Sequence, residues 1–203
     1  NLVGISISIE PGSAAYIPLK HQSADNFIQL NLDLVIEKLK PILEDPKIIK
    51  IGQNIKYDAH IFLNNGVCLK GIDEDTMLMS YVLESNQSHG MNKLSKRYLG
   101  HDCISYESLV GKGVKQITFD QVYIEDATPY AAEDADVTLQ LFQHLNNLLK
   151  ENKKLQKVYK DIEIPSMQAL IKVERNGVLV DSKILQKQSH EIGEKLINLE
   201  KEA

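Results

Sequence analysis

Residues 2–64 alternate between strand and helix patterns, and no other feature of the sequence constrains the fold as strongly. Residues 2–9 and 14–19 alternate apolar with small or polar side chains, as half-buried strands do. Pro11 and Gly12 lie between them in the order that a type II turn favours. We therefore expect a β-hairpin at the start of a layered α/β domain.

Helix patterns follow the hairpin and dominate the second half of the chain. An apolar face recurs at helical spacing over residues 32–43, a β-branched run over 47–51 predicts a short strand, and a further helix is expected over 56–64. Three short helices are expected next, over residues 76–83 with Asp75 as the cap, over 91–99 and over 106–110. A long helix is expected from the capping pair Thr128-Pro129 to about residue 150, and another helix is expected to end at Glu174, before Asn176-Gly177. A short strand over 178–180 and a last helix capped by Asp181 complete the expected elements.

The composition is that of a folded globular domain. Hydrophobic residues make up 43% of the 203 residues and charged residues 25%, which excludes a disordered or low-complexity chain. The net charge of −5 gives no general nucleic-acid footprint. No apolar run reaches the ~18 residues that a membrane span requires. Cys68 and Cys103 are far apart and lack metal-ligand spacing, so they predict reduced thiols of a cytoplasmic protein.

The charge balance of the chain changes sign near residue 150. Residues 1–149 are net acidic, whereas residues 150–203 are net basic. We therefore expect one domain over residues 1–150 and, over residues 151–203, a connector that leads into a second segment.

Two short stretches carry residues suited to chemistry. Residues 52–58, Gly-Gln-Asn-Ile-Lys-Tyr-Asp, lie where a strand pattern gives way to a helix pattern, and residues 130–136, Tyr-Ala-Ala-Glu-Asp-Ala-Asp, open the long helix. Tyr130 and Asp134 are four positions apart, so a phenol and a carboxylate share one helix face. Two carboxylates alone favour divalent-metal phosphate chemistry only weakly. Simpler interpretations stay open, with Asp134 interacting with the helix dipole and Asp58 as a surface residue.

The two stretches resemble the second and third motifs of the proofreading 3′→5′ exonuclease domain of bacterial DNA polymerase I (family A). Further strings similar to that domain are Val3-Gly4-Ile5-Ser6 through Glu10-Pro11-Gly12, Ala15-Tyr16-Ile17-Pro18, Asp75-Thr76-Met77-Leu78, Gly111-Lys112-Gly113 and Asp134-Ala135-Asp136-Val137-Thr138-Leu139. The string Glu174-Arg175-Asn176-Gly177-Val178, followed by Asp181, is similar to the start of the polymerase region. The resemblance implies a ribonuclease H-like exonuclease fold, a mixed sheet flanked by helices, over residues 1–150, and the connector and base of the polymerase thumb, a helical segment, over residues 151–203.

The resemblance also implies hydrolysis of DNA with two divalent metal ions, Mg²⁺ or Mn²⁺. Asp134 would bind the metal that activates water, Asp58 would hold the second metal, and Tyr130 would orient the attacking water. The residues implied to contact the 3′ end of a single strand or of primer-template DNA are Gln53, Asn54, Lys56, Tyr57 and Tyr106, the last by stacking on a terminal base. Alternatives stay open for Tyr106, as a half-buried packing residue, and for Asn54, as a turn residue.

The family's first motif, an Asp-x-Glu on a strand near the centre of the sheet, falls before the region that matches Asn1–Ile9. No Asp-x-Glu in residues 1–20 replaces it, so we expect the fold to lack its first strand and these 203 residues alone to have negligible exonuclease activity. A vestigial domain that only supports a polymerase and an RNA-trimming exonuclease are the alternatives. DNA synthesis in replication and repair is expected to reside in a larger bacterial, cytoplasmic parent, because no palm carboxylates follow here.

Overall fold

The computed structural model describes residues 2–22 and 28–202. The chain divides into two compact units, Asn1–Ile171 and Lys172–Ala203, which are described separately. The first unit holds both chemical stretches singled out from the sequence.

The first unit begins with the expected hairpin. Strands β1 (Gly4–Glu10) and β2 (Ser13–Pro18) pair antiparallel, with an irregular register between Ser8 and Glu10. Gly12 in the connecting turn has φ +81°, the left-handed conformation that glycine adopts without steric cost. The hairpin prediction is therefore confirmed.

Strands β3 (Ile51–Gly52) and β4 (Glu74–Asp75) form a parallel pair. The strand expected over 47–51 is shorter in the structure, and Ile48 and Ile49 ahead of it are 41% and 58% exposed. Strand β4 was not predicted from the sequence, because its two residues are acidic and show no apolar strand pattern. Within the described part of the chain, one antiparallel and one parallel pair give the mixed α/β architecture that the sequence predicts.

The helices agree closely with expectation. They are α1 (Leu32–Leu43), α2 (Ile55–Asn64), α3 (Thr76–Leu83), α4 (Met91–Tyr98), α5 (Tyr106–Val110), the 3₁₀ turns η1 (Gly113–Lys115) and η2 (Phe119–Gln121), α6 (Ile124–Glu151), α7 (Lys153–Val158), the π-helical turn η3 (Tyr159–Glu163), α8 (Ile164–Asn176) and α9 (Ser182–Glu202). As predicted, the Asp75 carboxylate caps α3 by accepting from the amides of Met77 and Leu78 at 2.9 and 3.1 Å.

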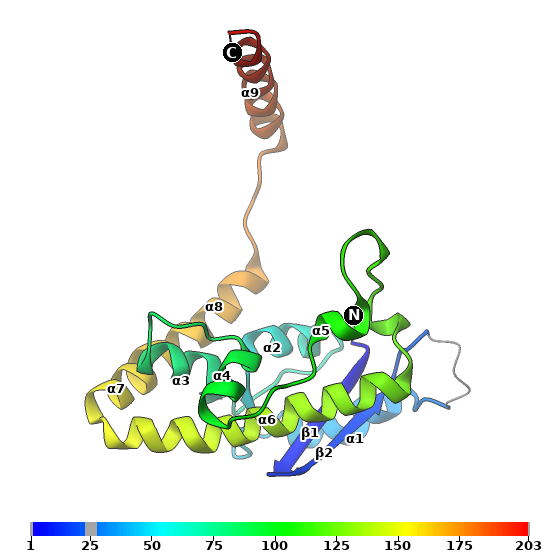
Figure 1. The fold of residues 1–203 in the computed structure, drawn as a ribbon, viewed down its shortest axis with the longest axis vertical. Helices are drawn as coiled ribbons and strands as arrows, with labels where there is room; N and C mark the ends of the chain where they lie inside the picture. The colour runs from blue at the N-terminus through cyan, green and yellow to red at the C-terminus, as the bar shows by residue number, and fades with distance from the viewer. Residues whose placement is uncertain (1, 23–27, 203) are drawn as a thin grey trace. The chain divides into compact units, whose positions relative to one another are not determined.

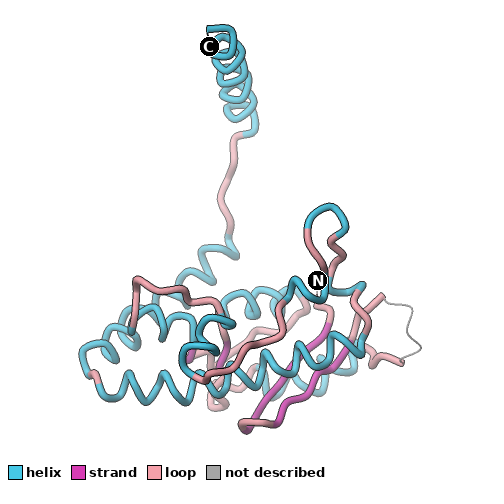
Figure 2. Tube along the Cα trace, viewed as in Figure 1, coloured by secondary structure: helices cyan, strands magenta, loops and turns pink. Residues whose placement is uncertain are grey.

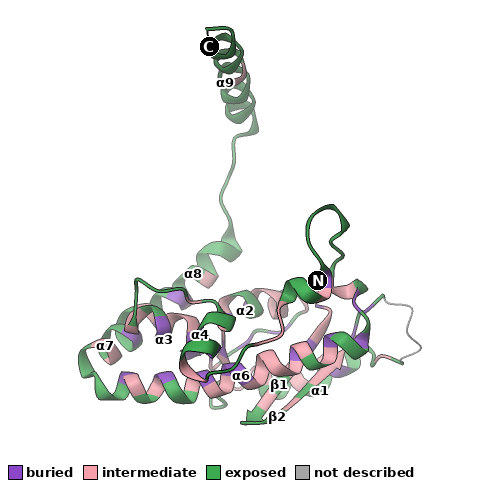
Figure 3. Cartoon of the chain, viewed as in Figure 1, coloured by how far each residue is buried: buried purple, intermediate pink, exposed green. Residues whose placement is uncertain are grey.

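Helix α6 is the element on which the first unit is assembled. It contacts β1, β2 and β3 as well as α3 and α4, and Figures 1 and 2 show the hairpin lying against it. Its buried stripe continues through Val137, Leu141, Leu145 and Leu149. Figure 3 shows purple, buried segments recurring along α6. Burial of each leucine side chain in this stripe stabilises the fold by about 1.5–3 kcal/mol. The stripe therefore fixes α6 in the core, and with it the residues near the start of the helix that are suited to chemistry.

The expected start of this helix at Thr128-Pro129 is wrong, because α6 begins at Ile124 and Pro129 lies inside it. Ile124 and Ala127 are 5% and 0% exposed, and this burial favours extending the helix. Pro129 is exposed in the second turn, where solvent can take the place of the amide that proline lacks.

Residues 151–171 pack against the rest of the first unit. Tyr159, in η3, is 0% exposed; its hydroxyl accepts from the Asp75 amide at 2.8 Å and donates to Glu74 Oε2 at 3.0 Å. Lys160 adds an ion pair to Glu74. The compact unit therefore extends to Ile171, whereas the functional division at residue 150 stays a prediction.

The second unit contains the end of α8 and all of α9. Asp181 caps α9 as expected, accepting from the amides of Lys183 and Ile184 at 3.0 and 3.2 Å. The strand expected over Val178–Val180 is wrong, because these residues are 59% or more exposed and have no pairing strand in the described chain. No helix among the described residues is both long and apolar enough to cross a membrane.

Candidate active site

The first of the two stretches suited to chemistry, residues 52–58, lies where β3 ends and α2 begins. Asn54 there has φ +62° and precedes α2 without a side-chain cap, so the helix start is held by a residue from elsewhere in the chain. The Asp75 carboxylate, 1% exposed, accepts from the amides of Ile55 at 2.8 Å and Asn54 at 3.3 Å. Asp75 therefore caps two helices and orients the turn that leads to Asp58.

Asp58 lies in the first turn of α2. The pKa of Asp58 is raised to about 6, mainly because its carboxyl loses solvent and to a smaller extent because of the negative charge of Asp75. The residue as a whole nevertheless remains exposed. A cation near Asp58 would oppose both effects, because it favours the charged carboxylate.

Tyr130 and Asp134 interact directly on α6, as their spacing predicts. Burial is the main cause that raises the Asp134 pKa to about 6, a hydrogen bond from the Tyr130 hydroxyl lowers it, and the charge of Glu133 raises it further. Burial, and then the charge of Asp134, raises the pKa of Tyr130, so the phenol stays protonated and donates. Asp134 Oδ1 is buried and has no hydrogen-bond partner among the described residues.

An aromatic cluster surrounds Tyr130. The ring centroids of Tyr106 and Phe119 lie 6.2 and 5.8 Å from that of Tyr130, and 6.2 Å from each other in a stacked arrangement. Tyr106 is 43% exposed, so one part of its ring is accessible while another packs in the cluster. Sequence analysis missed Phe119, which lies in an irregular polar stretch with no periodicity to mark it.

The other positions predicted to contact DNA differ in their surroundings. The Gln53 amide donates to the His89 carbonyl at 2.8 Å and accepts from Thr76 Oγ1, so its side chain is held by the protein. Tyr57 is 64% exposed, and Lys56 is partly buried. Among these residues Tyr57 has the most surface available to a ligand.

The two predicted metal ligands are perturbed by different neighbours. Asp58 is perturbed by Asp75, and Asp134 by Tyr130 and Glu133. Each group fits a hard divalent cation. Asp134 offers a buried, unpaired carboxylate oxygen, and Asp58 offers a carboxylate beside a second acid.

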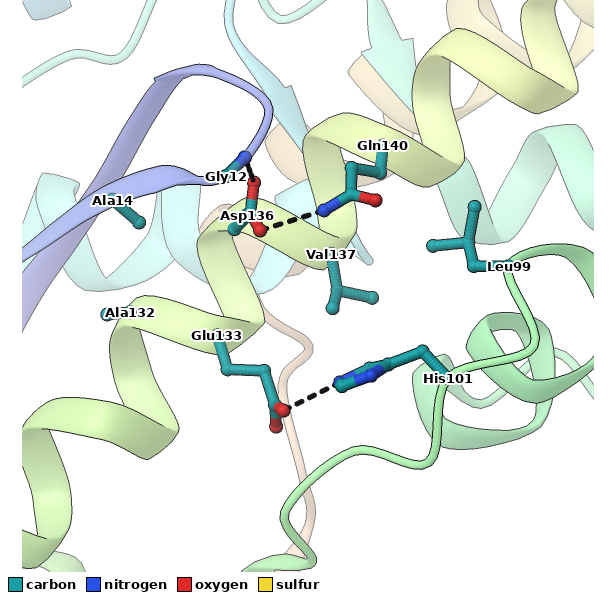
Figure 4. A pocket seen from close by; sticks show the side chains of 9 residues that line it. All are labelled: Gly12, Ala14, Leu99, His101, Ala132, Glu133, Asp136, Val137 and Gln140. Carbon is teal, nitrogen blue, oxygen red and sulfur yellow. Dashed lines mark hydrogen bonds and ion pairs between the residues drawn. The ribbon is translucent and has the colours of Figure 1, made fainter.

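A separate hollow of about 430 Å³ lies on the neighbouring face of α6, and its lining includes none of Asp58, Tyr130 and Asp134. Figure 4 shows its polar contacts. Asp136 accepts from the Gly12 amide at 2.7 Å and from Gln140 at 2.8 Å, and Glu133 Oε1 lies 2.7 Å from His101 Nε2. The contact with Gly12 fastens the hairpin to α6, whereas the contact with Gln140 lies within α6.

Comparison with known proteins gives a consistent result. A family model described as 3′-5′ exonuclease matches residues 1–150. The chain is 49% identical to DNA polymerase I of Pseudomonas aeruginosa, over 100% of this chain and 22% of that protein, and 38% identical to DNA polymerase I of Rhizobium leguminosarum, over 99% and 21%. It therefore spans about a fifth of the length of these curated relatives.

Solved structures agree on the fold. The POL domain of Pol1 from M. smegmatis, in complex with DNA primer-template and dNTP, aligns with a TM-score of 0.66 at 21% identity, over 91% of this chain and 29% of that one. Brucella melitensis NrnC aligns with a TM-score of 0.55 at 18% identity, over 82% and 74%. These likenesses show a nuclease-type fold.

Proposed function

This chain belongs to the 3′-5′ exonuclease family, as the exonuclease domain of a DNA polymerase I, and on that premise we propose that residues 1–150 take part, within the longer parent protein, in removing nucleotides from the 3′ end of a DNA primer. The observation that carries the proposal is the buried, unpaired Oδ1 of Asp134 beside the Tyr130 hydroxyl. A buried carboxylate oxygen without a donor is costly, and a bound cation supplies its partner.

Two divalent metal ions, Mg²⁺ or Mn²⁺, would supply an activated water and neutralise charge on the scissile phosphate. Asp134 would hold one ion through Oδ1, and Asp58 the other. The protonated Tyr130 hydroxyl would orient the attacking water.

The DNA strand would be held by residues around these carboxylates. Tyr106 would stack on the terminal base with the accessible part of its ring, supported from behind by Phe119. Tyr57 and Lys56 would contact the strand, while Gln53 and Asn54 would act through the backbone turn that Asp75 holds.

The parent protein would synthesise DNA in replication and repair in the bacterial cytoplasm, with residues 151–203 leading into its polymerase region. The polypeptide of these 203 residues by itself would have negligible nuclease activity, because the family resemblance implies four metal-binding carboxylates and only Asp58 and Asp134 match them here.

A calorimetric titration with Mn²⁺ tests the site. Binding by the 203-residue chain should weaken in Asp58→Asn and Asp134→Asn, and should be unchanged in Asp126→Asn, a matched substitution at an exposed position of α6. Equal binding by all four proteins would contradict the assignment and favour a vestigial domain.

Nuclease assays on 3′-labelled single-stranded DNA, with RNA as competitor, test the substrate and the activity of the chain. Release of mononucleotides that disappears in Asp134→Asn would contradict the proposed inactivity of this polypeptide and support the assigned site. A preference for RNA would contradict the DNA substrate.

A further inference from the structure

Three side chains from two segments converge beside the hollow on α6. The loop of residues 100–105 provides His101 and Cys103, and α6 provides Glu133; one ligand atom from each lies within 4.8 Å of the other two. None of the three is assigned to the exonuclease chemistry proposed above. We propose that His101, Cys103 and Glu133 form a binding site for a thiophilic divalent cation of the Zn²⁺ class, separate from the nuclease metals.

The ligand types favour zinc over magnesium. Thiolate, imidazole and carboxylate are the common protein ligands of Zn²⁺, and a set of three with an open fourth position is a recurrent arrangement. Mg²⁺ avoids sulfur and selects oxygen ligands. His101 and Glu133 line the hollow, which leaves room for water or a further ligand at the fourth position.

The geometry needs only small side-chain adjustments. Two ligand atoms on one tetrahedral zinc ion are about 3.3–3.8 Å apart. The three atoms already lie within 4.8 Å, and the closest pair, His101 Nε2 and Glu133 Oε1, is at 2.7 Å. Because His101 is exposed, rotation of its ring can open this pair by about an ångström and admit an ion.

The surroundings hold the three ligands in place. Glu133 Oε2 accepts from the Ile104 amide at 2.6 Å, which leaves Oε1 for the ion. Ser95, 0% exposed, donates to the His101 carbonyl at 3.0 Å and also hydrogen-bonds with the Cys103 thiol. Such outer contacts orient metal ligands and commonly change metal affinity 10–100-fold.

An ion at this site would tie the loop to α6. The loop leads directly into α5, whose first residue is Tyr106, and Glu133 is the neighbour of Asp134 in the sequence. Loading with metal would therefore stiffen the segment between the base-stacking residue and the carboxylate of the nuclease site.

Cobalt absorption spectroscopy tests the proposal, because Co²⁺ bound to a thiolate gives a charge-transfer band that oxygen ligands do not. The reduced, metal-free 203-residue chain should develop this band with one equivalent of Co²⁺, and Zn²⁺ should remove it. Cys103→Ser should abolish the band, and His101→Gln should weaken Co²⁺ binding at least about tenfold.

Two variants are controls. Cys68→Ser removes the other cysteine, which is exposed and outside the cluster, and Asp58→Asn alters a proposed nuclease metal ligand; both should retain the band. A wild-type chain without the band, a band that survives Cys103→Ser, or a band lost in Cys68→Ser would overturn the site. If Cys103→Ser does not fold, the substitution of the exposed His101 carries the same test.

Discussion

Replacing Asp134 with Asn is expected to stabilise the metal-free chain while removing a proposed metal ligand. Burial raises the Asp134 pKa from 3.8 to about 6, so the folded state binds this proton more tightly than the unfolded state does. The free energy of unfolding therefore falls as pH rises from about 4 to about 6, and the loss is complete at higher pH. Asn carries no charge, but its carbonyl still accepts from Tyr130, so the variant avoids this loss.

The magnitude follows from the difference between the two pKa values. About 2.2 pKa units at 1.36 kcal/mol each amount to about 3 kcal/mol at pH 8. At pH 5 the same linkage gives about 1.5 kcal/mol, because the folded state is still mostly protonated there. For a domain of this size, the difference at pH 8 corresponds to a rise in Tm of roughly 6–12 °C as an upper limit.

Urea denaturation in EDTA at pH 5 and pH 8 measures the effect. Asp126→Asn, in the first turn of the same helix, is the matched control and should lose about 0.3–1 kcal/mol, because it removes a favourable interaction with the helix dipole. An Asp134→Asn chain that is less stable than wild type at pH 8, or whose gain is the same at both pH values, would refute the reasoning. Adding Mn²⁺ should stabilise the wild type more than the variant.

Three other substitutions test the packing and the proposed DNA contact. Tyr159→Phe should lower the free energy of unfolding by about 1–3 kcal/mol in urea titrations, because a buried amide loses its acceptor; Tyr81→Phe, at a residue 51% exposed, should not. Tyr106→Leu should weaken single-stranded DNA binding by about 1–3 kcal/mol in fluorescence anisotropy, and an unchanged Kd would contradict stacking. Gly71→Ala should lower the free energy of unfolding by about 1–3 kcal/mol in thermal unfolding, because φ is +67° and the added Cβ would clash with a backbone carbonyl. Gly90→Ala is the control and should lower it less, because the space around its added Cβ is open.

Much of the fold was predictable because its elements carry their own signals. Helix α1 has the bounds expected from its apolar spacing, and Asp75 and Asp181 cap the helices that follow them. The errors arose where contacts between distant segments determine the bounds of an element. Burial of Ile124 starts α6 before its proline, and strand β4 is a polar pair stabilised by Tyr159, which follows it by 84 positions.

The candidate site was predictable only in part. The spacing of Tyr130 and Asp134 correctly indicated a shared face, since both lie on one regular helix. The contact of Asp75 with the turn before Asp58, and the place of Phe119 in the aromatic cluster, depend on segments that are distant in the sequence. No local pattern encodes such distances, so single-sequence reasoning could not supply them.

The bond between the Gly12 amide and Asp136 has a consequence for synthesis on the ribosome. It joins positions 124 residues apart, so at about 5–20 residues per second the hairpin is made roughly 6–25 s before its partner. A two-stranded hairpin is marginally stable by itself, and Ile9 at its tip remains 89% exposed even in the folded chain. In nascent chains that end before α6, this hairpin should therefore be protease-sensitive, and it becomes protected only when that helix has emerged.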